Sequence, residues 1–231
     1  MVKKARELSN NDFFIGITDI VEGIDIIANM RGPQNLCYDL IDEPDVIHSR
    51  IKQLDNIYFE YYDRMYDVVK QEDNSSCYMC FSIWGHGKTA KIQCDFSALM
   101  SPNQFKEFTV PSIREQCKRL DNALYHLDGV DALKHVDELL KIKDIKAIQW
   151  TAGAGKPDGG SEQWYDLYEK VRSSGKPLWI QIETGCIDEW IEKADKIVRL
   201  FGNQGLYFLF PNMSDKDAKK LLSKAEDSWT F

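Results

Sequence analysis

The stretch LWIQIETGCIDEWIEKADKIVRLFGNQGLYFLF, residues 178–210, decides the fold. It contains an apolar run at 178–183, a segment whose apolar residues recur at helical spacing until Gly202, and a second apolar run at 206–210. Recurrence every 3.6 residues indicates an amphipathic helix, and a short unbroken apolar run indicates a buried strand. The stretch therefore predicts a strand, a helix and a strand, which is the unit of parallel sheets covered by helices.

The same alternation extends toward the N-terminus, with apolar runs at 13–18, 77–84, 123–127 and 146–150. Six parallel strands in one α/β domain over residues 1–231 are therefore expected. A long helix is predicted after Pro44. Its expected buried side carries Val46, Ile47, Ile51, Leu54, Ile57, Tyr58, Tyr61, Met65 and Val68. Ser101 and Pro102 begin another helix, which Pro111 interrupts because its ring cannot continue the hydrogen-bonding pattern.

Three short patterns have ordinary interpretations. The pair Cys77 and Cys80 has the spacing of a redox or metal site, but it lies in an apolar run and is interpreted as part of a strand. The segment from Gly153 to Lys156 lacks the spacing of a phosphate-binding loop and is interpreted as a connecting loop. No glycine-rich fingerprint follows the first apolar run, so no nucleotide cofactor is expected.

Composition excludes several classes of partner. Lys and Arg total 29 and Asp and Glu total 37, which gives a formal charge of −8. The chain has no dense basic run, so nucleic acid is not an expected partner. It has neither an apolar stretch of membrane-spanning length nor an N-terminal apolar run of signal length. We expect a cytoplasmic protein in which the six cysteines are mostly reduced thiols.

Several segments resemble the uroporphyrinogen decarboxylase superfamily. They are Gln93–Phe105 followed by Glu107, Phe108 and Pro111; Arg31-Gly32 with Asp39–Pro44; Tyr125–Gly129; His135–Asp137; and Ile148–Trp150. The resemblance implies a (β/α)8 TIM-barrel-like fold with its active site at the carboxyl ends of the strands. The superfamily includes the decarboxylase itself and methyltransferases that move methyl groups between corrinoid proteins and thiols.

Six strands are two fewer than a complete barrel requires. Against this family the chain is expected to be an N-terminally truncated or split member, without the upstream arginines and aspartate that hold the tetrapyrrole in the decarboxylases. Bare strand edges associate unless they are covered. We therefore expect a homo-oligomer, or a partner chain that supplies the missing strands.

Polar residues follow the predicted strands, and parallel strands bring such positions to one edge of a sheet. We expect Asp95, His126, Asp128 and Glu183 to be catalytic. His126, Asp128 and Glu183 together offer the nitrogen and oxygen ligands of a catalytic Zn²⁺. The alternative is that Asp128 caps the following helix and His126 bonds locally. The methyltransferase branch binds zinc through His-x-Cys and a later Cys, and neither is matched here.

Four further residues are expected to bind substrate: Asp19, His86, Ser97 and Trp150. For His86 the alternative is a solvated loop residue, and for Trp150 it is a place in the core. His48 and His135 are interpreted as structural because both fall within predicted helices.

The favoured function is a methyltransferase-type enzyme acting on a corrinoid- or thiol-linked methyl group, with a small molecule or a corrinoid protein as substrate. Two alternatives stay open: a degenerate or split member that acts as a non-catalytic subunit, and a fragment of a true decarboxylase of porphyrin biosynthesis. The strand-end residues are mostly acidic, with Lys88 and Lys156 the nearest expected cations, which disfavours a substrate with eight carboxylates.

Overall fold

The computed structural model describes residues 1–10 and 12–229. It divides into two compact units, the first formed by residues 1–126 and 131–146 and the second by residues 127–130 and 147–231. The fold is mixed α/β, with a five-stranded all-parallel sheet in the order β4-β5-β6-β7-β8 and a three-stranded sheet in the order β1-β2-β3. The prediction of a parallel α/β fold is confirmed at this level.

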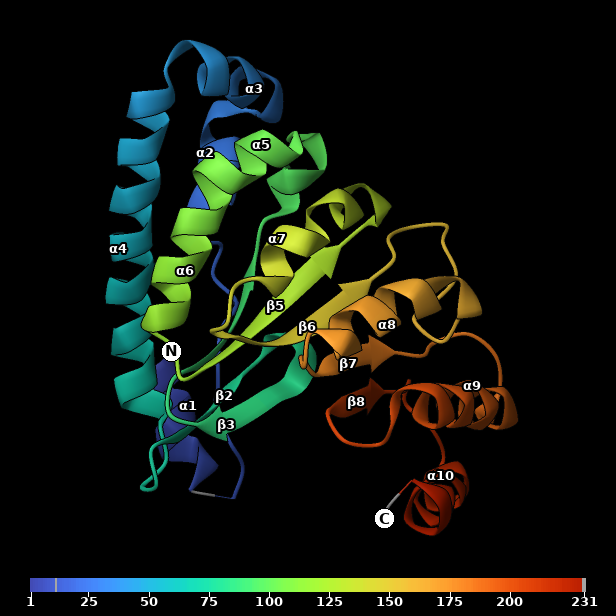
Figure 1. Cartoon of the computed structure of the whole chain (residues 1–231). Helices are drawn as coiled ribbons and strands as arrows, with labels where there is room; N and C mark the ends of the chain where they lie inside the picture. The colour runs from blue at the N-terminus through green and yellow to red at the C-terminus, as the bar shows by residue number, and fades with distance from the viewer. Residues whose placement is uncertain (11, 230–231) are drawn as a thin grey trace. The chain divides into compact units, whose positions relative to one another are not determined.

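The first unit carries most of the helices. Its elements are α1 (Val2–Ser9), β1 (Gly16–Ile17), α2 (Gly23–Arg31), α3 (Pro33–Asp42), α4 (Pro44–Val69), β2 (Ser75–Tyr78), β3 (Ile83–His86), β4 (Thr89–Gln93), α5 (Pro102–Gln104), α6 (Val110–Lys118), most of β5 (Asn122–Asp128) and α7 (Val136–Leu140). The long helix α4 lies beside α6, as Figure 1 shows. Helix α4 begins at the predicted proline.

The apolar run 77–84 is not one strand, and that prediction is wrong. β2 ends at Tyr78, and β3 returns antiparallel to it from Ile83. Phe81 and Ser82 make the turn with φ of 62° and 50°, in the left-handed region that side chains disfavour. The turn contains no Gly, Pro, Asn or Asp, so no ordinary turn signal marks it in the sequence.

The structure contains a strand, β4, that is not among the six expected strands. The strand β1 is shorter than the predicted run 13–18. Phe13 and Phe14 lie outside β1 and are 58% and 52% exposed. β4 escaped prediction because Lys91 interrupts its apolar pattern, although this side chain is buried. The described residues thus contain eight strands rather than six.

The expected buried side of the long helix α4 is confirmed in part. Ile47, Ile51 and Tyr58 are buried as expected, whereas Val46, Ile57 and Tyr61 are all more than 40% exposed. Apolar side chains occur on several faces of this helix, so periodicity alone does not identify the face that packs.

The helix that begins at Ser101 changes pitch before it reaches Pro111. Ser101 caps α5 as predicted: its side chain accepts from the backbone N–H of Gln104, and its backbone N–H donates to Gln104 Oε1. A π-helical turn, Phe105–Thr109, follows and leads into α6. Pro111 then lies in the first turn of α6, where a missing N–H costs nothing.

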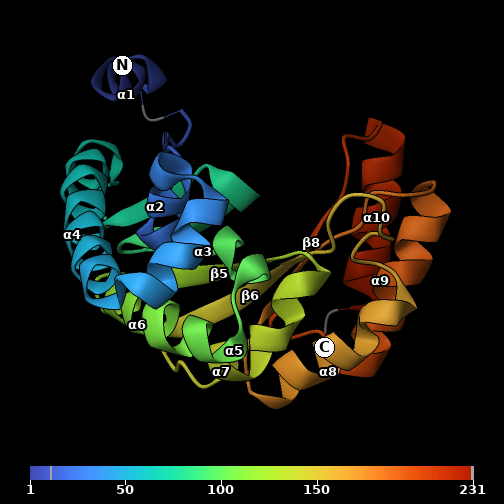
Figure 2. The same cartoon turned by 90° about the horizontal axis from the view of Figure 1, so that it is seen from above.

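The second unit contains the strands and helices that follow. They are β6 (Ile145–Thr151, which begins in the first unit), α8 (Tyr165–Ser173), β7 (Leu178–Gln181), α9 (Ile187–Phe201), β8 (Leu206–Leu209) and α10 (Asp215–Ser228). β6, β7 and β8 pair in parallel, with Ile148 opposite Leu178 and Leu178 opposite Leu206. Helices α9 and α10 lie side by side (Figure 2).

Candidate active site

Three predicted catalytic residues lie where parallel strands end. β4 and β5 pair with Gln93 opposite His126, and Asp95 follows β4 by two residues. Asp128 is the last residue of the same strand as His126, and alternation along the strand places both side chains on one face. Asp95, His126 and Asp128 each offer a ligand atom, and these atoms lie within 4.8 Å of one another.

Asp95 is held in place by Asp25, which lies in the first turn of α2. The two oxygens of Asp25 accept the backbone N–H groups of Asp95 and Phe96 at 2.8 and 2.9 Å. Gln93 Nε2 donates to Asp95 Oδ2 at 2.9 Å. Because Asp25 is buried, these bonds fix the loop after β4 against α2. The position of Asp95 is therefore set by the fold.

An aromatic ring lies over the imidazole of His126. The ring centroids of Phe81 and His126 are 4.7 Å apart at an interplanar angle of 39°. Phe81 occupies the left-handed turn between β2 and β3, a conformation that costs about 1–2 kcal/mol for a residue with a side chain. Backbone strain of this kind gathers at functional sites, where the surrounding structure maintains it.

A buried lysine lies on β4, two residues before Gln93. Lys91 Nζ is 3.0 Å from Asp19 Oδ1, 2.7 Å from Gln93 Oε1 and 3.7 Å from Glu22 Oε1. Burial alone would lower the pKa of Lys91, but attraction to Glu22 and the hydrogen bond to Asp19 outweigh it and the pKa is raised. Lys91 is therefore an ammonium ion. Asp19, an expected substrate-binding residue, also accepts the Tyr78 hydroxyl at 2.8 Å.

Glu22 is the second acidic neighbour of Lys91. It is completely buried, and its carboxyl group lies by the backbone N–H of Gln93 and 3.7 Å from Lys91 Nζ. Burial raises the pKa of Glu22 well above its usual range; Lys91 opposes the shift, and Asp25 and Asp19 add to it. The carboxyl group of Glu22 is therefore protonated more readily in the folded chain than in the unfolded chain. Lys91 and Asp19 form an ion pair beside it.

The second unit has a pocket of about 480 Å³ at the carboxyl ends of β6 and β7. Three predicted residues, Asp128, Trp150 and Glu183, line it. Trp150 is only 1% exposed and packs edge-on against Trp164 with ring centroids 5.0 Å apart, which fits the core alternative. The other residues lining this pocket are Thr151, Ala152, Gly153, Ala154, Lys156, Pro157, Asp158, Gly159, Gln181 and Thr184.

Asp158 stabilises one wall of this pocket through hydrogen bonds and an ion pair. Its Oδ2 accepts the backbone N–H groups of Glu183 and Thr184 at 2.8 and 2.6 Å, and Lys193 Nζ lies 3.2 Å away. Burial alone would raise the pKa of Asp158, but the hydrogen bonds from Thr184 and Glu183 and the charge of Lys193 lower it. The loop before Asp158 was expected to be a simple connection. The ionised carboxylate of Asp158 instead holds it against the end of β7.

Glu183 accepts a hydrogen bond from Gln181 Nε2. It lies in the second unit, whereas His126 is the last residue of the first unit before the chain crosses. That Glu183 shares an ion with His126 and Asp128 stays a prediction.

Of two further predicted substrate-binding residues, His86 lies away from these strand ends, and Ser97 lies buried in the turn that follows β4. His86 belongs to an antiparallel strand and is paired with Ser75, the first residue of β2. Its carbonyl accepts from Asn122, the first residue of β5, so His86 is at the amino ends of the strands. Ser97 is buried, and its carbonyl oxygen is 2.9 Å from His135 Nε2. The interpretation of His135 as structural fits this contact.

The sequence did not single out Lys91, Glu22 and Asp158. A lysine inside the short pattern TAKIQ was the available signal for Lys91, since a charge within a strand is retained when it has buried partners. Glu22 lies within an apolar segment, VEGI, where a lone carboxyl group is equally unusual.

The donor set at the end of β5 fits a divalent cation. One imidazole and two carboxylates are the ligands that Zn²⁺ accepts in catalytic sites with an open position. Gln93 and Asp25 supply the outer hydrogen bonds that orient a ligating carboxylate. This set contains Asp95, whereas the set expected from the sequence contains Glu183 beside His126 and Asp128.

A comparison with models of known protein families finds no match, and a search of curated proteins finds no relative. Across the residues that the structure describes, none of the helices is both long and apolar enough to traverse a bilayer.

Proposed function

We propose that this chain is an enzyme of the uroporphyrinogen decarboxylase superfamily, of the methyltransferase type, built on an incomplete (β/α)8 barrel. The resemblance of its sequence segments supports the family. The parallel order of β4 to β8 and the polar residues at the strand ends support the barrel. The described cysteines carry free thiols, which supports a place in the reducing cytoplasm.

The observation that carries the proposal is the convergence of Asp95, His126 and Asp128 within 4.8 Å. These residues would hold a divalent cation, Zn²⁺ in the first instance. When bound, such an ion lowers the pKa of a thiol so that it reacts as a thiolate.

The residues of the chain would position the reacting groups. Asp25 and Gln93 fix Asp95, and the ring of Phe81 shields one side of His126 from water. Lys91 is paired with Asp19, so its ammonium group is not available to bind a multiply charged anion. A thiol and a methylated corrinoid, on a small molecule or on a protein, are the substrates that fit. A homo-oligomer or a partner chain completes the barrel in this proposal.

Metal content tests the site directly. Protein purified without chelator should contain close to one divalent ion per chain by elemental analysis, and His126→Ala should lose it. His48→Ala is the matched control, because His48 lies on α4 outside this cluster. Equal metal content in the two variants would refute the site.

Methyl transfer tests the reaction. In the proposed step the thiolate sulfur forms a bond to the methyl carbon of methylcobalamin, the cobalt–carbon bond breaks, and its electron pair stays on cobalt. The thioether and the reduced cobalamin should appear together, and His126→Ala should abolish both. A wild-type chain that binds metal but transfers no methyl group would contradict the methyltransferase and favour the non-catalytic subunit.

A further inference from the structure

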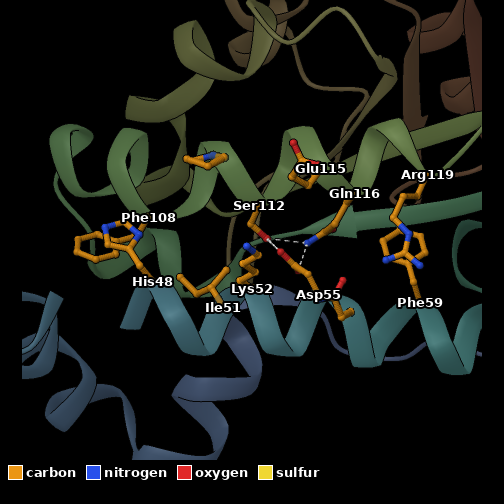
Figure 3. Close-up of a pocket in the computed structure, with 12 residues that line it drawn as sticks. His48, Ile51, Lys52, Asp55, Phe59, Phe108, Ser112, Glu115, Gln116 and Arg119 are labelled. Carbon is orange, nitrogen blue, oxygen red and sulfur yellow. Dashed lines mark hydrogen bonds between the residues drawn. The ribbon is translucent and has the colours of Figure 1, made fainter. Parts of the chain in front are cut away.

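A second cavity lies in the first unit, between α4 and α6, and has no part in the proposed methyl transfer. Its volume is about 410 Å³, within the range of small-molecule sites. Figure 3 shows Asp55 of α4 pointing toward Ser112 and Gln116 of α6. Apolar side chains, among them Phe59 and Phe108, form part of its wall.

A buried carboxylate lies at the base of this cavity; the charge of Arg119 acts on it from a distance and forms no ion pair with it. Asp55 is 8% exposed and accepts from Ser112 Oγ at 2.6 Å and from Gln116 Nε2 at 2.9 Å. Both donors are neutral, and no ion pair within 4.0 Å is formed with a described Lys, Arg or His. Burial raises the pKa of Asp55. A buried carboxylate is costly unless it is paired, so the base of the cavity is complementary to a cation.

The hydrogen-bond network around Asp55 also lacks donors. Gln116 donates through Nε2 to both Asp55 and Ser112, while its Oε1 is buried and accepts from no described residue. The network therefore has acceptor capacity that the described chain does not fill. An ammonium group supplies three donors and a positive charge together.

The rim of the cavity carries a charge of the opposite sign. Lys52 is exposed, lines the cavity and makes no ion pair with a described residue. It lies three residues before Asp55 on α4, so the two side chains are on the same face of the helix. The other rim cation, Arg119, is already engaged: its guanidinium lies 4.0 Å from the Phe59 ring centroid and 3.7 Å from Asp63.

We infer that this cavity binds a small zwitterion of the α-amino-acid type with an apolar, aromatic side chain. The ammonium group of the ligand meets Asp55, its carboxylate meets Lys52, and its side chain packs toward Phe108 at one end of the cavity, where His48 stacks on that ring. The spacing agrees, because adjacent ammonium and carboxylate groups match two charged side chains one helical turn apart. A site on the helical layer, away from Asp95 and His126, suits a regulatory ligand.

Binding of L-phenylalanine to the full chain tests the inference by calorimetry. Phenethylamine lacks its carboxylate and 3-phenylpropionate lacks its ammonium group, and each should bind at least tenfold more weakly than L-phenylalanine. A charge-assisted hydrogen bond accounts for a loss of about that size. Absence of saturable L-phenylalanine binding up to about 10 mM would overturn the inference.

Two substitutions test which side chain of the cavity binds which charged group of the ligand. Lys52→Gln should reduce the affinity for L-phenylalanine to that for phenethylamine, and leave phenethylamine binding unchanged. Asp55→Asn should reduce it to that for 3-phenylpropionate. Arg50→Gln, which removes a charge from α4 outside the cavity lining, is the control. If Asp55→Asn fails to fold, Lys52→Gln still decides, because Lys52 is exposed; undiminished binding in Lys52→Gln would refute the inference.

Discussion

The ammonium group of Lys91 lies 3.0 Å from Asp19 and 3.7 Å from Glu22, so one buried cation faces two carboxyl groups. Lys91 is 1% exposed and Glu22 is fully buried, whereas the Asp19 side chain is 39% exposed. The two acids therefore differ in burial, and burial raises the pKa of Glu22 well above its usual range. Each can replace the other as the counter-ion of Lys91.

This arrangement predicts strong non-additivity in stability. At pH 4.5, Asp19→Asn and Glu22→Gln alone should each change the free energy of unfolding by about 1 kcal/mol or less, because the remaining acid balances Lys91. The double variant leaves Lys91 buried and unpaired and should lose about 3–5 kcal/mol. Urea unfolding of the four proteins measures the coupling. At the exposed Arg64–Glu60 pair the corresponding coupling should stay below about 1 kcal/mol.

The raised pKa of Glu22 predicts a pH-dependent effect of Glu22→Gln. Above the ordinary value of 4.5 the unfolded chain releases this proton while the folded chain keeps it, so the wild type loses stability as the pH rises toward the folded pKa. Glu22→Gln removes that loss. Its free energy of unfolding relative to wild type should therefore increase from pH 4.5 upward. A difference independent of pH between 4.5 and 8 would contradict the buried, protonated state; Glu60→Gln on the exposed face of α4 is the control.

Asp158→Asn should loosen the wall of the second-unit pocket. The variant loses the charge that strengthens the hydrogen bonds from the Glu183 and Thr184 amides and pairs with Lys193. A hydrogen bond to a charged group contributes about 1.5–3 kcal/mol, so hydrogen exchange at Thr184 should accelerate about tenfold or more. Asp166→Asn on the exposed side of α8 should leave that exchange unchanged.

The chain should not decarboxylate uroporphyrinogen at a useful rate. Eight substrate carboxylates require clustered cations, but Lys91 is committed to Asp19, and Lys156 is the one cationic side chain among the described residues that line the second-unit pocket. The formal charge of −8 also repels the substrate. The assay measures coproporphyrinogen formed by the purified protein. Turnover within tenfold of about 10 s⁻¹ would contradict this argument.

Much of the fold was predictable because strands β5 to β8 are apolar runs between helices of clear periodicity. The hairpin β2–β3 was not, since its turn is made by Phe81 and Ser82 rather than by residues that favour turns. β4 was missed because Lys91 looks like a surface residue until its partners Asp19 and Glu22, distant along the chain, are in place.

The residues of the candidate site were also predictable only in part. His126 and Asp128 were predictable because parallel strands gather their ends at one edge, whereas Asp95 rested on the family resemblance, since the strand that it follows, β4, was not expected. The place of His86 was not predictable, because it depends on β3 running antiparallel to β2. Asp158 was missed because its function comes from accepting backbone N–H groups of a strand end 25 residues further along.

The π-helical turn Phe105–Thr109 gives the chain an extra residue just before α6. Each residue of an α-helix advances the side chains by about 100° around the axis. Deleting one residue from this turn would swing Ser112 and Gln116 away from Asp55 without altering any of the three. The cavity between α4 and α6 is thus encoded by the length of a segment that does not line its polar base, and a sequence comparison blind to that single insertion would place the wrong residues opposite Asp55.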